Sequence, residues 1–279
     1  MIESKFYLNN VKDHTVTDES FTLCVNKKHG FLETKPKPVE LSGYYKSEDY
    51  ISHTDRTATF FEKTYQAVKS KTIRSKVKRI QKTTLKGATV LDFGCGTGDF
   101  LVACKNAGFS ILGFEPNSDA ATLSQKKGVE LISSIENLKD NSVDVITLWH
   151  VLEHLPNLEN DIAQFKRVLK PNGTLIIAVP NYKSFDAKWY KQFWAAYDVP
   201  RHLWHFDKKS IKSLFSTFQF LLQKTNPMWF DAFYVAMLSE KIQKKSFSFI
   251  KGIFIGFLSN TSGLLKKQFS SHIYTFKNV

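Results

Sequence analysis

Three glycines lie between an apolar run and the start of a helical pattern, in the segment Val90–Phe100 (VLDFGCGTGDF). Gly94, Gly96 and Gly98 let the backbone turn tightly and approach a ligand closely, because glycine has no side chain. A helix that begins at Asp99 points its free backbone N–H groups at whatever the loop holds. This arrangement predicts a loop that binds the anionic part of a ligand.

A carboxylate closes the next apolar run. Glu115 lies 17 residues after Gly98, where an acidic side chain can accept hydrogen bonds from both hydroxyls of a ribose. Asp92 adds a second carboxylate inside the preceding strand. The dinucleotide fingerprint would place its third glycine at position 99, but the residue there is Asp99. The pattern therefore disfavours a nicotinamide dinucleotide, which stays open as an alternative ligand.

A second polar segment, Asp198–Phe206 (DVPRHLWHF), follows the fifth apolar run of the main domain. Ligands of open parallel sheets bind at the carboxyl ends of strands, so this segment is expected to overhang the site. Arg201, His202 and His205 could bind an acidic acceptor or remove a proton from it. The alternative is structural: Pro200 and Trp204 pack, and the histidines are satisfied within the fold.

The segment His150–His154 (HVLEH) matches a zinc signature, H-x-x-E-H. Such a site needs one sustained helix and a further carboxylate ligand. Here an apolar strand runs to Leu148, and Pro156 follows shortly after the motif. Cys24 and His29, near the N-terminus, are too few to close a tetrahedral site. We therefore expect no metal at either place.

Strand and helix patterns alternate from Ala88 onward, which is typical of βαβ units and hence of a parallel sheet. The sequence predicts an α/β fold with a mainly parallel sheet and helices on both faces. His272–Lys277 is expected to return as an antiparallel last strand at one edge. The expected parallel strands are Thr89–Phe93, Ser110–Glu115, Val129–Ile132, Val143–Leu148 and Thr174–Val179.

The ends of the chain depart from this alternation. Residues 1–56 hold short β-like runs, Phe21–Val25 and Phe31–Thr34, followed by two prolines. We interpret them as a small appendage or lid. Residues 57–279 form the main domain, with a helical insertion at about 228–270 before the last strand.

Charge and composition restrict the partners. The chain has 279 residues and a net charge of +13, much of it on an expected amphipathic helix at 57–82. We interpret that charge as a solvated face, with a docking surface for phosphate groups or acidic lipid as the alternative. Phe247–Leu265 is apolar but interrupted by Lys251 and polar residues, which favours a helical cap or a lipid contact over a membrane span.

Three cysteines in a chain of this length suggest a reducing compartment. The N-terminus shows no continuous apolar segment typical of a secretory signal. We expect a cytoplasmic protein.

Four segments in the same order resemble the successive motifs of class I S-adenosylmethionine (SAM)-dependent methyltransferases. They are VLDFGCGTG, GFEPN at 113–117, SVDVITLWHVLEHLPN at 142–157 and LKPNGTLIIAVPN at 169–181. The resemblance covers about 86–220 and is greatest to the UbiG-like branch, which modifies quinone precursors, sugars and other small molecules. It implies a Rossmann-like fold.

The resemblance implies where the cofactor SAM is held. The methionine part belongs to Gly94, Cys95, Gly96 and Gly98, beside Asp92, and the ribose to Glu115. The adenine lies near Pro116, Ser134 and Ile135, while Trp149 and His150 line the sulfonium side. In related enzymes a Tyr-rich segment like that around Tyr50 folds across SAM.

Catalysis is expected to depend on positioning, because the sulfonium already activates the methyl group. The expected acceptor is a small molecule that is acidic or lipid-like, and no nucleic acid is expected. If the acceptor must lose a proton, the candidate bases are His154, His202 and His205, in rising order, and Arg201 is expected to pair with an acidic group. Two other readings stay open: an NAD-dependent oxidoreductase, and a non-catalytic nucleic-acid- or membrane-binding module on a methyltransferase fold.

The glycine spacing and Glu115 predict that the protein binds SAM or its product S-adenosylhomocysteine, and does not bind NAD. Titration calorimetry with the three ligands checks this, with heat of binding expected only for the two adenosyl-sulfur compounds. Tight binding of NAD with none of SAM would overturn the expectation.

Overall fold

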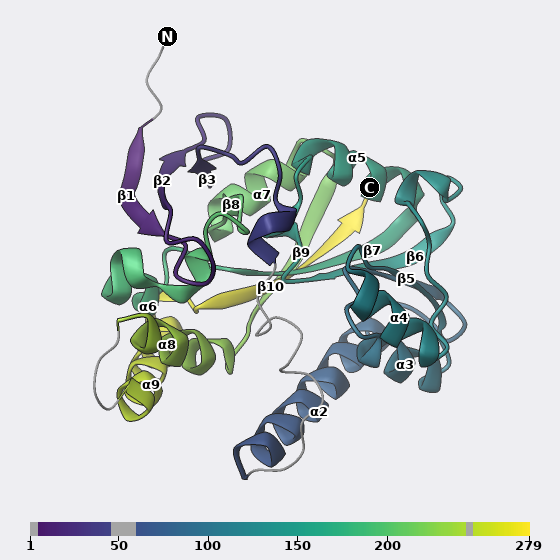
Figure 1. Ribbon diagram of the computed structural model, residues 1–279. Coiled ribbons are helices and arrows are strands. Elements are labelled where there is room, and N and C mark those ends of the chain that lie inside the picture. Colours follow the sequence, from purple (N-terminus) through teal and green to yellow (C-terminus); the bar gives the residue numbers. More distant parts are fainter. Residues whose placement is uncertain (1–4, 46–59, 244–247) are drawn as a thin grey trace.

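The computed structural model describes residues 5–45, 60–243 and 248–279 (Figure 1). Its centre is one six-stranded sheet in the order β5-β4-β6-β7-β10-β9. The strands are β4 (Thr89–Phe93), β5 (Ser110–Phe114), β6 (Val143–Trp149), β7 (Leu169–Pro180), β9 (Phe220–Pro227) and β10 (Ser271–Asn278).

β5, β4, β6 and β7 pair in parallel, whereas β10 is antiparallel to both β7 and β9. The expected α/β fold with an antiparallel last strand is confirmed. Two details differ. β10 lies inside the sheet with β9 at the edge, and Val129–Ile132 contributes only an isolated bridge from Leu131 to Gly113.

Helices cover both faces of the sheet, as expected for strands that are apolar on both sides (Figure 1). Alternate residues of the strands enter two separate clusters. One cluster contains Val90, Val145 and Ile176, and the other contains Leu91, Ile146 and Ile177. On the first side pack α2 (Phe60–Gln81) and α3 (Asp99–Asn106), and on the second α5 (Leu158–Val168) and α7 (Lys208–Ser216). The helix α4 (Ser118–Lys126) follows β5.

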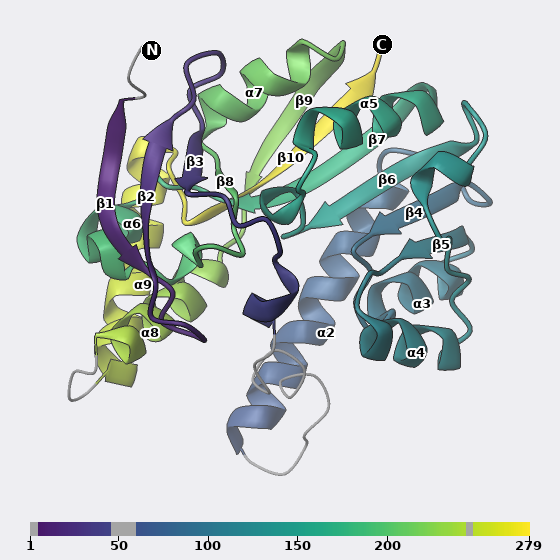
Figure 2. The same ribbon diagram turned by 45° about the horizontal axis from the view of Figure 1, so that its top comes forward.

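The N-terminal segment forms a second, antiparallel sheet with an unexpected fourth strand. β1 (Phe6–Lys12), β2 (Ser20–Val25) and β3 (Leu32–Lys35) pair in sequence order. β3 then pairs with β8 (Trp204–His205), which belongs to the segment expected at the acceptor. Figure 2 shows this small sheet beside the large one. The boundary expected at 56 falls outside the described residues.

The insertion before β10 consists of α8 (Asp231–Ile242) and α9 (Ser248–Lys266), which pack against each other below the small sheet (Figure 1). Several large apolar side chains of α9 are more than half exposed: Phe249, Ile250, Phe254, Phe257, Leu264 and Leu265. Among the described residues, no helix is both long enough and apolar enough to cross a membrane.

Short helical elements lie in the connections between the longer helices and strands. They are η1 (Ser42–Tyr45), η2 (Ile135–Asn137), η3 (Leu152–His154), α6 (Phe185–Tyr190), η4 (Lys191–Phe193) and η5 (Ala195–Tyr197). η3 follows the end of β6, and the elements from α6 to β8 follow the end of β7. Because the carboxyl ends of parallel strands meet at one edge of a sheet, this order brings both polar segments of the sequence to the same edge.

Candidate functional site

The glycine loop at the end of β4 has one open position. All three glycines have positive φ. A Cβ atom at Gly94 would lie 2.5 Å from a methyl group of Val151, and one at Gly98 would lie 2.5 Å from Ser124 Oγ. A Cβ at Gly96 would meet nothing within 4 Å. The outer glycines are therefore required for packing within the protein, whereas Gly96 leaves space in which a ligand can approach the backbone.

Glu115 lies beside that open position. Its carboxylate accepts hydrogen bonds from the backbone N–H groups of Gly96 (2.8 Å) and Asn117 (2.9 Å). Backbone N–H groups of Gly94 and Cys95 also donate to the carbonyl of Phe114. The end of β5 thus holds the loop in place, and a half-buried carboxylate faces the same side as Gly96.

Asp92 and Cys95 support the loop from within the protein. Burial raises the pKa of Asp92 to about 7, against the hydrogen bond that the Thr147 hydroxyl donates to it at 2.6 Å. Burial also raises the pKa of the Cys95 thiol to about 12. The Cys95 side chain packs near Ser124, so only its backbone can face a ligand at the loop.

Trp149, the last residue of β6, has a cationic neighbour that sequence reasoning missed. Lys76 of α2 places its ammonium 4.3 Å from the centre of the Trp149 ring, and Phe100 meets the same ring edge-on. The indole N–H of Trp149 is buried and has no hydrogen-bond partner among the described residues. Lys76 precedes the core residue Val77. Because Lys76 is next to a residue of the buried face of α2, its sequence position could have distinguished it from the solvent-exposed lysines of that helix.

His150 is held as a cation between the sheet and the helical insertion. Its Nε2 lies 3.0 Å from Asp231 of α8 and its Nδ1 lies 3.3 Å from Glu153. Burial alone would lower the pKa of His150, but the hydrogen bonds to the two carboxylates raise it to about 10. An imidazolium cannot accept a proton, so His150 lines the site without serving as a base.

The residues expected near the adenine lie on loops beyond β5. Pro116 is exposed next to Glu115, and Ser134 caps η2 through a hydrogen bond with Glu136. The side chain of Ile135 is buried in the core beneath them. Tyr50, expected across SAM, lies outside the described residues.

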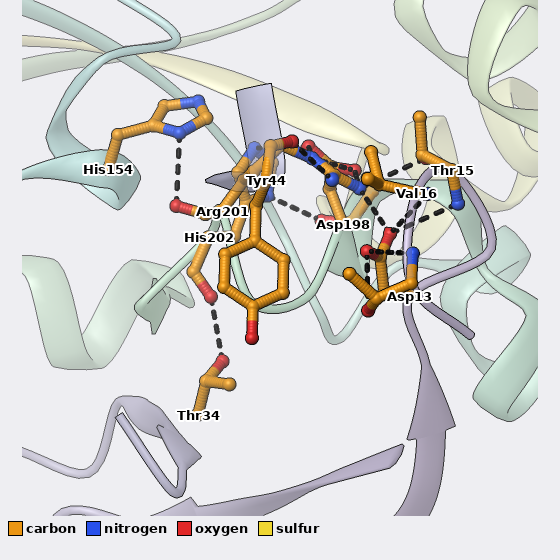
Figure 3. Close-up of polar contacts among 11 residues, drawn as sticks. Asp13, Thr15, Val16, Thr34, Tyr44, His154, Asp198, Arg201 and His202 are labelled. Carbon is orange, nitrogen blue, oxygen red and sulfur yellow. Dashed lines mark hydrogen bonds and ion pairs between the residues drawn. The ribbon is translucent and has the colours of Figure 1, made fainter. Parts of the chain in front are cut away.

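Arg201 is buried in a cluster of polar contacts (Figure 3). Its guanidinium pairs with Asp198 at 2.6 Å and with Asp13 of the N-terminal segment at 2.9 Å. It also donates to the carbonyl of Tyr44 and the hydroxyl of Thr15. The side chain of Arg201 is 3% exposed. In this arrangement its charge is compensated by protein carboxylates rather than directed into open space.

Two of the expected histidines, together with Glu153, form a compact group. One ligand atom of each of Glu153, His154 and His202 lies within 4.8 Å of the others. Both rings donate from Nδ1 to backbone carbonyls, His154 to Arg201 and His202 to Ala196. Burial and the neighbouring His202 lower the pKa of His154 to about 4. Sequence reasoning considered the HVLEH segment alone and so did not bring His202 to it.

A carboxylate and two imidazoles are able to bind a divalent cation. The positions of their ligand atoms can therefore be compared with the geometry of a zinc site. A tetrahedral zinc ion requires ligand atoms about 3.4 Å apart, and the group would have to contract to hold one. Oε1 of Glu153 also pairs with His150. The expectation that the chain binds no zinc stays a prediction.

His205 occupies the other side of the same segment. It is buried, its ring meets Tyr197 edge-on, and its Nε2 lies 3.0 Å from the hydroxyl of Thr34 in β3. Together with His202 it lines a small closed hollow at the end of β7, which has no room for a water molecule. The remaining residues that line this hollow are Pro180, Tyr182, Trp194, Ala196 and Trp204. Thr34 is a second residue that sequence reasoning missed, because nothing in the sequence around Thr34 indicates a contact with His205.

Comparison with known proteins places this geometry in a family. A family model described as a methyltransferase domain matches residues 65–225. The chain is 35% identical over 100 residues to a ubiquinone biosynthesis O-methyltransferase of Rickettsia canadensis, covering 33% of this chain and 42% of the relative. It is 31% identical over 136 residues to an uncharacterized protein of Methanocaldococcus jannaschii, covering 48% and 52%. The chain thus spans about half the length of the curated relatives it matches.

Solved structures share the fold. A putative sarcosine dimethylglycine methyltransferase from Galdieria sulphuraria superposes with a TM-score of 0.53 at 16% identity, over 76% of this chain and 86% of that one. Geranyl diphosphate C-methyltransferase from Streptomyces coelicolor gives 0.54 at 12% identity, over 81% and 87%. The resemblance inferred from the motifs, a SAM-dependent methyltransferase, is confirmed.

The open position at Gly96 and the carboxylate of Glu115 generate a prediction about cofactor affinity. Glu115→Ala should weaken binding of S-adenosylhomocysteine by about 1–3 kcal/mol, the usual cost of losing charge-assisted hydrogen bonds. Gly96→Val should weaken it more, because the branched side chain would fill the space beside the loop. Titration calorimetry on both variants measures the two effects.

Two control variants separate these effects from damage to the fold. Gly87→Val also places a side chain at positive φ in open space, but in the turn before β4. Asp119→Ala removes an exposed carboxylate from the first turn of α4. Both should bind as the wild type does. Wild-type affinity in a folded Glu115→Ala protein would mean that the ribose lies elsewhere.

The separation of the ligand atoms in the Glu153–His154–His202 group predicts that purified protein contains well below one zinc ion per chain. Elemental analysis after dialysis without chelator measures the content. About one zinc per chain, reduced in a His202→Gln variant but not in His29→Gln, would refute the prediction and identify the group as a metal site.

Proposed function

This chain belongs to the methyltransferase-domain family, and we propose that it methylates a small ring-bearing acceptor held against the segment 198–206. The observation that carries the proposal is the open face of Gly96. It is bordered by Glu115 at the end of β5 and lies at the same sheet edge as Trp149 at the end of β6. The histidine-bearing segment follows β7, the next strand along that edge.

The proposed cofactor site uses this chain's groups as follows. The backbone of Gly94, Cys95, Gly96 and Gly98 binds the methionine part of SAM, and Glu115 accepts hydrogen bonds from the ribose. SAM supplies an electrophilic methyl group on a positively charged sulfur. Trp149 borders that side of the site, and the ammonium of Lys76 lies 4.3 Å from the centre of its ring. Pro116, Ser134 and Ile135 border the adenine.

The acceptor is proposed to bind at the sheet edge beside the end of β7, next to the segment 198–206. The names of relatives as ubiquinone O-methyltransferases support a phenolic quinone precursor as the acceptor class. We also propose peripheral contact with lipid through the exposed apolar face of α9, which fits an acceptor that partitions into membranes.

We assign the proton transfer to His205 first, with His202 and His154 as the alternatives. Burial and the neighbouring His202 keep the pKa of His205 well below its usual value, so the ring is neutral and has a lone pair on one of its two nitrogens. The acceptor's nucleophilic atom bonds to the methyl carbon as the carbon–sulfur bond breaks, and its proton moves to the histidine. For Arg201 we propose a positioning role, because Asp13 and Asp198 already compensate its charge.

We propose a cytoplasmic location for the enzyme. Cys24, Cys95 and Cys104 are all unpaired, which fits a reducing compartment. The binding-only alternative is tested by measuring association with anionic vesicles and with nucleic acid across a range of salt concentrations.

His205→Gln should lower the turnover number by about 10²–10⁴-fold, the usual contribution of a positioned general base. Affinity for SAM should change less than about twofold, since the histidine does not contact the cofactor loop. A screen of metabolite extracts with methyl-labelled SAM first identifies the acceptor, and steady-state kinetics then compares the variants.

His29→Gln is the matched control, because His29 is also a buried histidine, but it contacts Ser213 of α7 rather than the hollow. It should turn over at the wild-type rate. If His205→Gln, His202→Gln and His154→Gln all keep that rate, the segment is structural and the proposed proton transfer is wrong.

A further inference from the structure

The hydroxyl of Thr34 determines which nitrogen of His205 carries the proton. Thr34 Oγ1 lies 2.7 Å from the backbone carbonyl of His202 and 3.0 Å from Nε2 of His205. A carbonyl can only accept a hydrogen bond, so the single hydroxyl proton is donated to it. The contact with His205 must then be donated by the ring. Nε2 of His205 is therefore protonated, and a neutral ring carries its lone pair on Nδ1.

We propose that Thr34 is a positioning residue that fixes His205 as the Nε2–H tautomer and so makes Nδ1 its proton-accepting atom. The inference rests on the proposed role of His205 in methyl transfer. It adds a residue of the N-terminal sheet to the acceptor side of the site, although Thr34 lies 171 residues before His205 in the chain.

The surroundings hold this contact rigidly. Thr34 is 2% exposed and His205 4%, so no water competes for the hydrogen bond. The backbone N–H of Thr34 donates to the carbonyl of Leu203 at 3.0 Å, and Leu32 pairs with His205 in the ladder between β3 and β8. The side chains therefore meet as a consequence of strand pairing, which restricts both of them.

The neighbouring His154 has the opposite tautomer. It donates from Nδ1 to the backbone carbonyl of Arg201, which assigns the lone pair of its neutral ring to Nε2. His202 likewise donates from Nδ1 to a backbone carbonyl, and its Nε2 lies 4.0 Å from the carboxylate of Asp198. The same cluster thus contains rings of both kinds. A change confined to His205 can be distinguished from a general rearrangement of the cluster.

The test compares Thr34→Val with Thr34→Ser by NMR of protein whose histidine rings are labelled with ¹⁵N. Valine keeps the shape of threonine but removes the hydroxyl, whereas serine keeps it. In the wild type, Nδ1 of His205 should show the shift of an unprotonated nitrogen and Nε2 that of a protonated one. Thr34→Val should change that pattern for His205 alone, and Thr34→Ser should restore it. His205→Gln assigns the signals.

Thr22→Val is the matched control, because Thr22 lies on β2 and pairs with Lys35, away from His205. It should leave all ring signals unchanged and also reports whether a Thr-to-Val change in this sheet disturbs the fold. A Thr34→Val protein that fails to fold leaves the wild-type spectrum as the decisive measurement. A wild-type His205 that is protonated on Nδ1 overturns the inference.

Turnover of the identified acceptor gives an independent readout. Thr34→Val should lower the turnover number by about 10–100-fold, within the contribution of a general base, and leave the affinity for SAM unchanged. Thr34→Ser should recover most of the rate. If the tautomer changes but the rate does not, the proposed role of His205 fails. If neither Thr34 variant alters the tautomer, the positioning role of Thr34 fails.

Discussion

The ion pairs of Arg201 with Asp13 and Asp198 connect the two parts of this protein. A buried guanidinium loses its hydration, and the loss is offset only when carboxylates and further acceptors surround it. Asp13 in turn accepts hydrogen bonds from the backbone N–H groups of the turn after β1. The cluster in Figure 3 therefore fixes the N-terminal turn and the start of the segment 198–206 at the same time. Because the guanidinium of Arg201 pairs with one carboxylate from each part, each part holds the other in place.

That connection explains why the small sheet contains a strand of the main domain. β8 has only two residues, too few to hold its place without partners. With Arg201 anchored, the chain enters β8 directly beside β3, and Thr34 meets His205. The N-terminal segment is therefore joined to the main domain by strand pairing and by ion pairs, and in the proposed function it belongs to the acceptor side of the site. The cofactor side has its own support, since the end of β5 holds the glycine loop through Glu115 and Phe114.

Much of the fold could be predicted because its determinants are local. Strands that are apolar on both faces, separated by helices of ordinary length, have few arrangements other than a parallel sheet. The position of β10 could not be read in the same way. The pattern of apolar and polar residues in β10 is the same as that expected of an edge strand. β10 is an internal strand only because β9 pairs with its other side.

The sequence by itself determined the arrangement of the residues that we propose bind the cofactor. Strand, glycine loop, helix and Glu115 lie within about thirty consecutive residues, so their spacing carries their geometry. Only the tertiary structure decided the acceptor half. It placed Arg201 between two carboxylates, brought His202 to Glu153 and His154, put Lys76 over Trp149 and gave His205 a partner in Thr34. These contacts join residues far apart in the chain. They arise from strand pairing and burial. The spacing of residues within one segment does not indicate which distant residue that segment will contact.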